Sequence, residues 1–197
     1  MRRKMFDALL STGGLLIAVV LIVSGALLTW GHSFVSSQVH TQLAAEKIFF
    51  PDKAGIAAQH DAEITKFVSP YAGQQVVNGQ QAAVFANHYI GVHLKAAGGG
   101  LTYSQLSAKA IADPTNVKLQ GQVATMFKGE TLRGLLLNSY AFDKMGQIAL
   151  VGSIVSFVGA ALMLLLAGFG FLHLRRTDPA EQVLTRLGAR TPAPVEI

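Results

Sequence analysis

The sequence predicts an all-α membrane protein in which two transmembrane helices flank an extracytoplasmic helical domain. Two uncharged apolar stretches, residues 13–30 and 147–172, are the main observation behind this prediction. The composition agrees, because 51% of the 197 residues are hydrophobic and only 14% are charged, whereas soluble domains carry about 25% charged residues. Basic residues beside both stretches predict the orientation. Residues 31–146 remain for one modest helical core.

The first apolar stretch, residues 13–30, is 18 residues long and carries no charge. A helix of that length rises about 27 Å, close to the ~30 Å hydrocarbon core of a bilayer. Trp30 at its end suits the headgroup level, where aromatic rings accumulate. A cleaved signal peptide is the alternative, but no A-x-A-like site of small residues follows the stretch. We therefore expect the segment to be retained as a membrane anchor.

The second stretch, residues 147–172, has 26 uncharged residues and gives the strongest signal in the chain. A soluble helix of that length would need a polar face, which Ser153 and Ser156 do not supply. Neither stretch contains Asp, Glu, Lys, Arg, His or Pro. Proton relays and ion pathways need ionisable groups within the membrane. A self-sufficient transporter or channel is therefore not expected.

Basic residues precede the first stretch and follow the second, and they predict which side of the membrane each segment occupies. These membrane-interface residues are Arg2, Arg3, Lys4, Arg175 and Arg176. Under the positive-inside bias they place the N-terminus, residues 1–12, and the tail, residues 173–197, in the cytoplasm. The intervening segment exceeds the ~60 residues over which loop charge counts, so we expect it outside the plasma membrane.

Small residues recur four positions apart in both apolar stretches. The members of these ridges are Gly14, Ala18, Gly25 and Thr29 in the first stretch and Gly152, Ser156 and Ala160 in the second. Such spacing allows the backbones of membrane helices to approach closely. The ridges can serve contact between the two spans or contact with another membrane protein, and the sequence leaves both open.

The segment after the first span reads as a series of helices. The first span is expected to continue as an amphipathic helix until Pro51, and one short helix is expected within residues 51–73. Residues 76–97 predict a longer helix with Asn78 as its N-cap, ended by the glycines at 98–100.

The segment before the second span predicts further helices and no sheet, because no alternating pattern of useful length occurs. Thr102 and Gln105 form a capping-box pattern that opens a helix over residues 103–111. Asn116 is expected to cap a short helix ending at Phe127. A separate helix is expected to start near Gly129 and to run without interruption into the second span.

The C-terminal tail carries a further helix signal. Asp178, Pro179 and Glu181 predict the start of a short amphipathic helix that ends near Gly188. A position on the inner leaflet and a solvated position are both compatible with its charges.

Catalytic and cofactor motifs are not found in the sequence. His88 and His93 lie five positions apart, about 140° around a helix, so they do not share a face as zinc-binding histidine pairs do. The chain contains no G-x-S-x-G, no G-x-x-x-x-G-K-[ST] and no basic stripe with interleaved aromatic residues. We therefore expect no catalytic residues, no metal, no cofactor, and neither nucleotide nor nucleic acid as a partner.

Four stretches of the chain resemble known proteins. Residues 77–94 and 128–150, with the Arg-rich start and residues 38–51, resemble actinobacterial two-span membrane proteins of uncharacterised function. The resemblance covers most of the chain and brings no catalytic motif. Some such proteins carry names taken from aromatic-ring-opening dioxygenases, a reaction that needs a metal held by His and carboxylate ligands. The residues do not support that name.

These observations favour a non-enzymatic membrane protein that binds other membrane proteins in the lipid bilayer. An accessory subunit of a larger complex, with respiratory assemblies as one candidate by analogy of topology, is the leading hypothesis. The alternative is an extracytoplasmic ligand-sensing or lipid-binding module with an apolar pocket. The residues expected around that pocket are Phe49, Phe50, Phe67, Phe85 and Tyr89.

Overall fold

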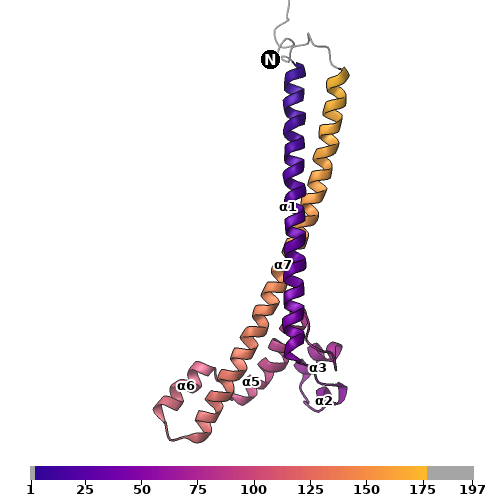
Figure 1. The fold of residues 1–197 in the computed structure, drawn as a ribbon. Helices are drawn as coiled ribbons and strands as arrows, with labels where there is room; N and C mark the ends of the chain where they lie inside the picture. The colour runs from indigo at the N-terminus through magenta and orange to yellow at the C-terminus, as the bar shows by residue number, and fades with distance from the viewer. Residues whose placement is uncertain (1–2, 177–197) are drawn as a thin grey trace, which may run out of the picture. The chain divides into compact units, whose positions relative to one another are not determined.

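The computed structural model describes residues 3–176, and every regular element in this range is a helix (Figure 1). In chain order these are α1 (Arg3–Glu46), α2 (Lys53–Ala57), α3 (Ala62–Val68), the 3₁₀ turn η1 (Ser69–Tyr71), α4 (Gly79–Val84), the π-helical segment η2 (Phe85–Ile90), α5 (Gly91–Ala97), α6 (Tyr103–Ala112) and α7 (Val117–Arg176). The one β-type pairing in the described range is an isolated bridge between Phe49 and Gln75. The prediction of an all-helical fold is confirmed.

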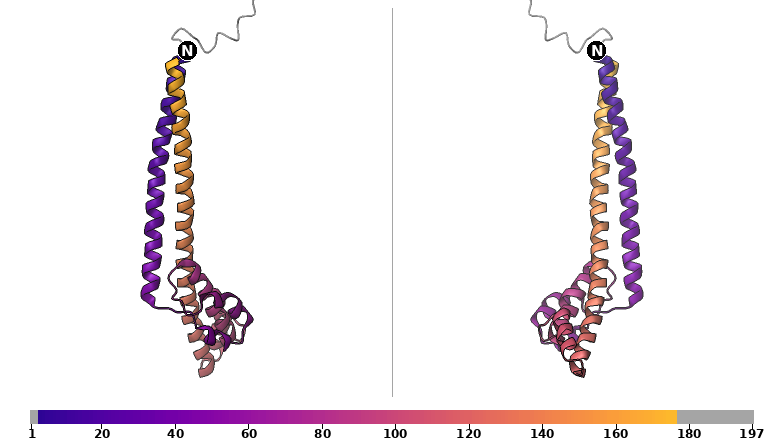
Figure 2. Two further views of the ribbon diagram at one scale, coloured as in Figure 1. Left: turned by 90° about the vertical axis from the view of Figure 1, so that its right-hand side faces the viewer. Right: turned by 90° about the vertical axis from the view of Figure 1, so that its left-hand side faces the viewer.

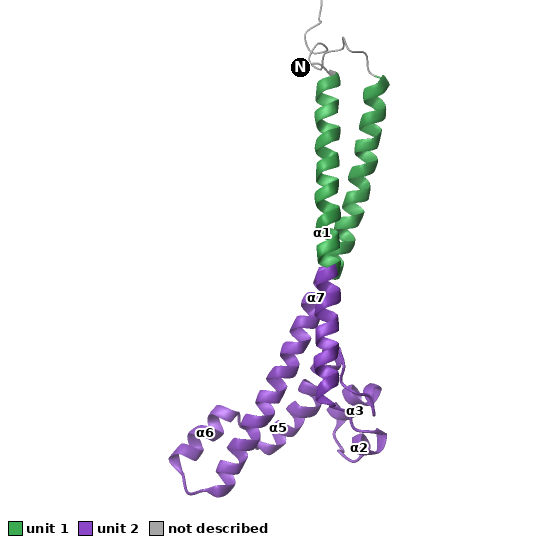
Figure 3. Cartoon of the chain, in the orientation of Figure 1, with its two compact units in different colours: residues 1–29, 150–197 green, residues 30–149 purple. Residues whose placement is uncertain are grey.

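The chain divides into two compact units (Figure 3). Residues 1–29 and 150–197 form the first, here called the span unit, and residues 30–149 form the second, the central domain. The helices α1, with 44 residues, and α7, with 60, contribute to both. Each contains a window long and apolar enough to cross a membrane, as the two predicted spans require.

In the span unit, α1 and α7 lie side by side (Figure 2). Small residues occupy the contact, where Ala18, Ala160 and Ala167 are at most 4% exposed. Only 11% of each apolar window is buried inside the protein. The remaining apolar side chains point away from the partner helix, and a helix that is apolar all round belongs in hydrocarbon or in a larger core.

The main core of the central domain is made of apolar side chains from almost every element between the spans. The part of α1 beyond residue 29 contributes Val39 and Leu43, and α7 contributes Leu136. At the centre, the ring of Phe50 packs edge-on against Phe85 at 5.3 Å and stacks on Tyr71 at 5.2 Å. The short helices α2, α3 and α4 are therefore held against the two long ones by burial rather than by their own helical propensity.

A second, smaller cluster joins α5, α6 and α7. Leu94, Leu106 and Met126 are buried in it, with Leu101 and Val123 packed at its edge. The three glycines that end α5 allow the chain to reverse between α5 and α6, since Gly99 and Gly100 adopt positive φ values of 59° and 79°.

The predicted cap of α4 and the predicted cap of α6 are both confirmed. Asn78 accepts a hydrogen bond from the backbone N–H of Gln81 at 2.9 Å. Thr102 and Gln105 form the full capping box, each side chain accepting from the backbone N–H of the other. These short polar side chains satisfy N–H groups that the first helical turn leaves without partners.

Helix α1 ends earlier than predicted. It stops at Glu46 rather than at Pro51, because Lys47 adopts a positive φ of 51°. The extended residues that follow pair with the chain before α4: Phe50 N–H donates to Gln74 at 2.9 Å and Val76 N–H to the carbonyl of Ile48 at 2.8 Å. This pairing needs extended backbone at residues 48–50 and so competes with the helix.

The predicted helices within residues 51–97 are more divided in the structure. Residues 51–73 hold α2, α3 and η1 instead of one helix, with Asp52 and Asp61 as N-caps of α2 and α3. The single helix predicted over residues 76–97 begins only after Asn78 and contains the π-helical segment η2 between α4 and α5.

Helix α7 is one continuous element, so the predicted break between Phe127 and Gly129 is wrong. Asn116 caps its start as predicted, accepting from Leu119 N–H at 3.1 Å. Gly129 is required for packing rather than for a break, since a Cβ there would collide with Leu94. The helix predicted from Asp178 lies outside the described residues.

Replacing Gly129 by Ala is expected to lower the free energy of unfolding by about 1–3 kcal/mol, because the methyl group overpacks a closed core. A Cβ at this position would overlap Leu94 Cδ2 and lie 3.1 Å from its Cγ. Gly121 on the same helix is a matched control with nothing within 4 Å. Gly121→Ala should be neutral or stabilising by up to about 1 kcal/mol. Thermal unfolding followed by circular dichroism checks this, and equal losses in both variants would contradict it.

Candidate functional site

The outward surface of the span unit is formed by large apolar side chains. Ten of them on α1 between Leu9 and Leu27 are at least 40% exposed, and α7 carries a similar set between Ile154 and Leu172. Soluble monomers rarely expose contiguous apolar surface beyond a few hundred Å². This surface is suited to lipid tails, which need no hydrogen bonds from the protein.

The residues of the predicted ridges in α1 and α7 lie between these two helices. A Cβ built on Gly14 would be 3.7 Å from the Cβ of Ala167, and one on Gly25 would be 3.0 Å from the ring of Phe157. Gly152 faces Leu28 in the same way, at 3.2 Å from its Cδ1. Glycine at these positions therefore lets larger side chains of the opposite helix approach the backbone.

The hydroxyl groups of the ridges are satisfied within the span unit. Thr29 donates to the carbonyl of Gly25 at 2.8 Å, and its oxygen lies 2.6 Å from Ser153 Oγ on α7. Ser156 donates to its own helix, to the Gly152 carbonyl at 2.8 Å. The sequence singled out Thr29 and Ser156 but not Ser153, because the position of a buried hydroxyl is fixed only by the rotation of one helix against the other.

Two more contacts of α1 with α7 were not predicted. Ser11, 5% exposed, fills the space left by the missing side chain of Gly170. Asp7 lies 4.0 Å from Nε2 of His173. No sequence pattern indicates these contacts, since single polar residues near a helix end are common.

The predicted interface residues lie near the ends of the apolar windows. Trp30 is 67% exposed and stacks on Phe34 at 5.7 Å, so two rings are presented where one was expected. Arg175 and Arg176 are exposed in the last turn of α7. Lys4 is partly exposed and Arg3 begins α1, whereas Arg2 lies outside the described residues.

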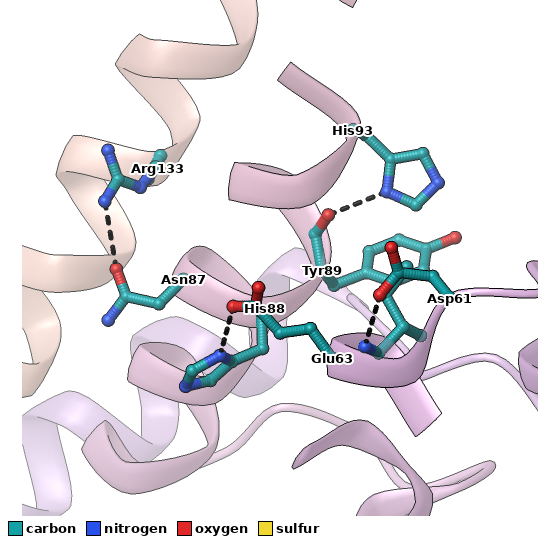
Figure 4. A network of polar contacts seen from close by, with 8 residues as sticks. Asp61, Glu63, Asn87, His88, Tyr89, His93 and Arg133 are labelled. Atoms are coloured by element: carbon teal, nitrogen blue, oxygen red, sulfur yellow. Dashed lines mark hydrogen bonds and ion pairs between the residues drawn. The ribbon is translucent and has the colours of Figure 1, made fainter. Parts of the chain in front are cut away.

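The polar residues of the central domain gather around η2 (Figure 4). His88 Nδ1 is 2.9 Å from Oε1 of Glu63, and its ring stacks on Phe67 at 3.9 Å. On the opposite side, Asn87 Oδ1 accepts from Nη2 of Arg133 at 3.1 Å. The wider π-helical turn shifts the register after Val84, so Asn87 and His88 reach different neighbours. Such turns occur often at functional sites.

The two histidines that were considered as metal ligands have separate partners. His88 contacts Glu63, whereas His93 bonds to the carbonyl of Tyr89 at 2.7 Å and to Gln59 at 3.1 Å. Within residues 3–176 no three His, Cys, Asp or Glu side chains lie close enough together to hold a metal ion.

A polar cavity of about 330 Å³ lies beside η2, between α5, the α5–α6 turn and α7. Its charged lining comes from Glu63, Lys95, Glu130 and Arg133. The sequence did not indicate it, because these residues are 70 positions apart and only the tertiary fold brings them together. Phe50 and Phe85, two of the five aromatic residues expected around an apolar pocket, are instead buried in the packed main core.

The central domain also has a groove of about 310 Å³ between α1 and α7, here called the α1–α7 groove. Its apolar walls are formed by Leu43, Ile48, Leu132, Leu135 and Phe142. Leu135 and Phe142 are 61% and 50% exposed. The groove therefore presents apolar side chains outside the predicted spans.

Comparisons with known proteins give no relative from which a site could be carried over. No protein-family model, curated protein or solved structure matches the chain. The resemblance of residues 77–94 and 128–150 to actinobacterial two-span membrane proteins stays a prediction.

The contact between the ridges can be tested by an engineered disulfide, because the chain has no cysteine of its own. In the variant Gly14→Cys/Ala167→Cys the Cβ atoms, 3.7 Å apart, fall within the roughly 3.5–4.5 Å that a disulfide requires. Mild oxidation is expected to protect both thiols from maleimide-polyethylene glycol. Gly14→Cys/Gly168→Cys is the control, since nothing lies within 4 Å of Gly168. A disulfide-linked dimer of the first variant would show instead that the ridges join different copies.

Proposed function

We propose that this protein is a non-enzymatic, two-span protein of the plasma membrane that acts as an accessory or interaction subunit of a larger membrane complex. Both termini lie in the cytoplasm, and residues 31–146 form an extracytoplasmic domain. The proposal rests mainly on exposed apolar side chains, which cover the span unit and also line the α1–α7 groove of the central domain.

The membrane location is supported by the amount of apolar surface that the protein leaves uncovered. With 11% of each apolar window buried, neither helix behaves as the core of a soluble domain, where an apolar helix is covered. A signal sequence would not need a partner, yet α1 packs on α7 through Gly14, Gly25 and Thr29. The pairing favours two retained spans.

The orientation is supported by the charges next to the spans. Lys4 precedes the apolar window of α1, and Arg175 and Arg176 follow the apolar window of α7. At the other end the stacked pair Trp30 and Phe34 supplies amphipathic and apolar rings for the headgroup region. Holding the cationic end in the cytoplasm places the central domain outside.

The role in an assembly is supported by the α1–α7 groove. Contiguous apolar side chains that remain exposed on a protein surface commonly mark a binding site for another protein or a ligand. The small-residue ridges contact each other within the span unit, so a partner protein would use this groove and the outward faces of the spans. No catalytic motif competes with this reading, and the resemblance to two-span actinobacterial proteins agrees with a respiratory or other membrane assembly.

The orientation predicts which engineered cysteines a membrane-impermeant maleimide labels in intact cells. Ser104→Cys, exposed at the start of α6, should be labelled without permeabilisation. Arg176→Cys, exposed at the end of α7, should be labelled only after the membrane is opened. Labelling of Arg176→Cys alone in intact cells would reverse the proposed topology, and release of the protein by alkaline carbonate would refute the membrane location.

The interaction role predicts that a charge in the α1–α7 groove releases partner proteins. Leu135→Glu and Phe142→Glu place a carboxylate on the apolar wall. Both positions are exposed, so the free energy of unfolding should change by no more than about 0.5 kcal/mol. Thr125→Glu, exposed on α7 outside the groove, is the matched control. Pull-down in mild detergent with mass spectrometry should lose the same proteins in both groove variants and keep them in the control. Recovery of the wild-type protein as a bare monomer would contradict the proposal.

A further inference from the structure

The polar cavity beside η2 has a wall on which positive charge is only partly neutralised. Arg133 has five N–H donors, and two of them are used: one toward Asn87 at 3.1 Å and one toward Glu130 at 3.4 Å. Its Nε is buried and has no hydrogen-bond partner among residues 3–176. Guanidinium groups with open donors are suited to carboxylates, which they bind with two parallel hydrogen bonds.

A second cation, Lys95, and a glycine of α5, Gly91, line the cavity together with Arg133. Gly91 and Lys95 are one turn apart on α5, so both face the cavity that they line. A Cβ on Gly91 would lie 3.8 Å from Nε of Arg133, so the guanidinium group lies directly behind this glycine. Lys95 makes no ion pair with another described residue, and its ammonium group is available to a ligand.

The same cavity also carries negative charge. Glu63 bonds to His88 through Oε1 and Glu130 contacts Arg133 through Oε2. The second carboxylate oxygen of each has no partner in the described part of the chain. Two cations and two carboxylates line the cavity, so a ligand with a single charge is attracted by one pair and repelled by the other. A ligand with one charge of each sign satisfies both pairs.

The rest of the lining is apolar. Leu94, Leu101 and Met126 form this part of the cavity and belong to the packed cluster of α5, α6 and α7. The volume of about 330 Å³ is at the small end of the range of about 300–1,000 Å³ for ligand pockets. A short apolar group can be buried here, whereas a lipid chain is too long.

We propose that this cavity binds a free α-amino acid with an apolar side chain. The carboxylate of the ligand binds Arg133 and Lys95, its ammonium group binds Glu63 and Glu130, and its side chain contacts the apolar part of the lining. The proposal goes beyond the role as an interaction subunit, because it depends neither on the orientation in the membrane nor on a partner protein.

Titration calorimetry on the full-length protein in detergent tests the charge requirement. Leucine, methionine and phenylalanine are the probes, and at least one is expected to bind with saturation. Isocaproate lacks the ammonium group of leucine and isoamylamine lacks its carboxylate. Each is expected to bind at least about tenfold more weakly than leucine, since hydrogen bonds to charged groups are lost. The proposal is overturned if none of the three amino acids binds, or if isocaproate binds as tightly as leucine.

Two variants locate the site. Gly91→Ala meets only ordinary contacts, at 3.5 Å and 3.8 Å, and favours the helix, so the protein stays folded while a methyl group enters the cavity beside Arg133. We expect at least about tenfold weaker amino-acid binding, against no change for the control Gly121→Ala. Lys95→Gln should also weaken binding, whereas Lys109→Gln on α6 should not. Unchanged affinity in Gly91→Ala would show that amino acids bind elsewhere and would refute the proposed site.

Discussion

The contact of α1 with α7 through small residues is the constraint on which the rest of the structure depends. Gly14, Gly25 and Gly152 remove side chains where the opposite helix presents Ala167, Phe157 and Leu28. In hydrocarbon the hydrophobic effect does not drive helices together, and close packing and hydrogen bonds take its place. The hydroxyl pair of Thr29 and Ser153 supplies the second contribution. Thr29 and Ser153 are 124 positions apart in the sequence, so this pairing brings distant segments of the chain together.

The local features of the fold could be predicted from the sequence because each depends on a few neighbouring residues. The caps formed by Asn78, Thr102 and Asn116 were found where their side chains stand just before a helix. The two long helices were indicated by uninterrupted apolar runs. Backbone capping and hydropathy are both properties of short segments, so no tertiary knowledge was needed for them.

The errors arose where tertiary contacts override local preference. Gly129 reads as a helix breaker, yet it is retained inside α7 because Leu94 occupies the space of its side chain. Lys47 has no sequence signal for a positive φ, but the pairing of Phe50 with the chain before α4 requires the helix to end there. The candidate sites follow the same division. The ridges could be found by spacing, whereas the cavity around Arg133 depends on four elements meeting and on a π-helical turn.

Several glycines of this protein act as recesses for a side chain from elsewhere in the same unit. Leu94 enters the recess at Gly129, the side chain of Asp143 fills that of Gly79, and Ser11 lies in that of Gly170. In each pair, the glycine can be replaced by a larger residue only if the side chain opposite it is replaced by a smaller one. Among evolutionary relatives, substitutions at the two members of a pair should therefore be correlated, and the three pairs should drift independently of each other.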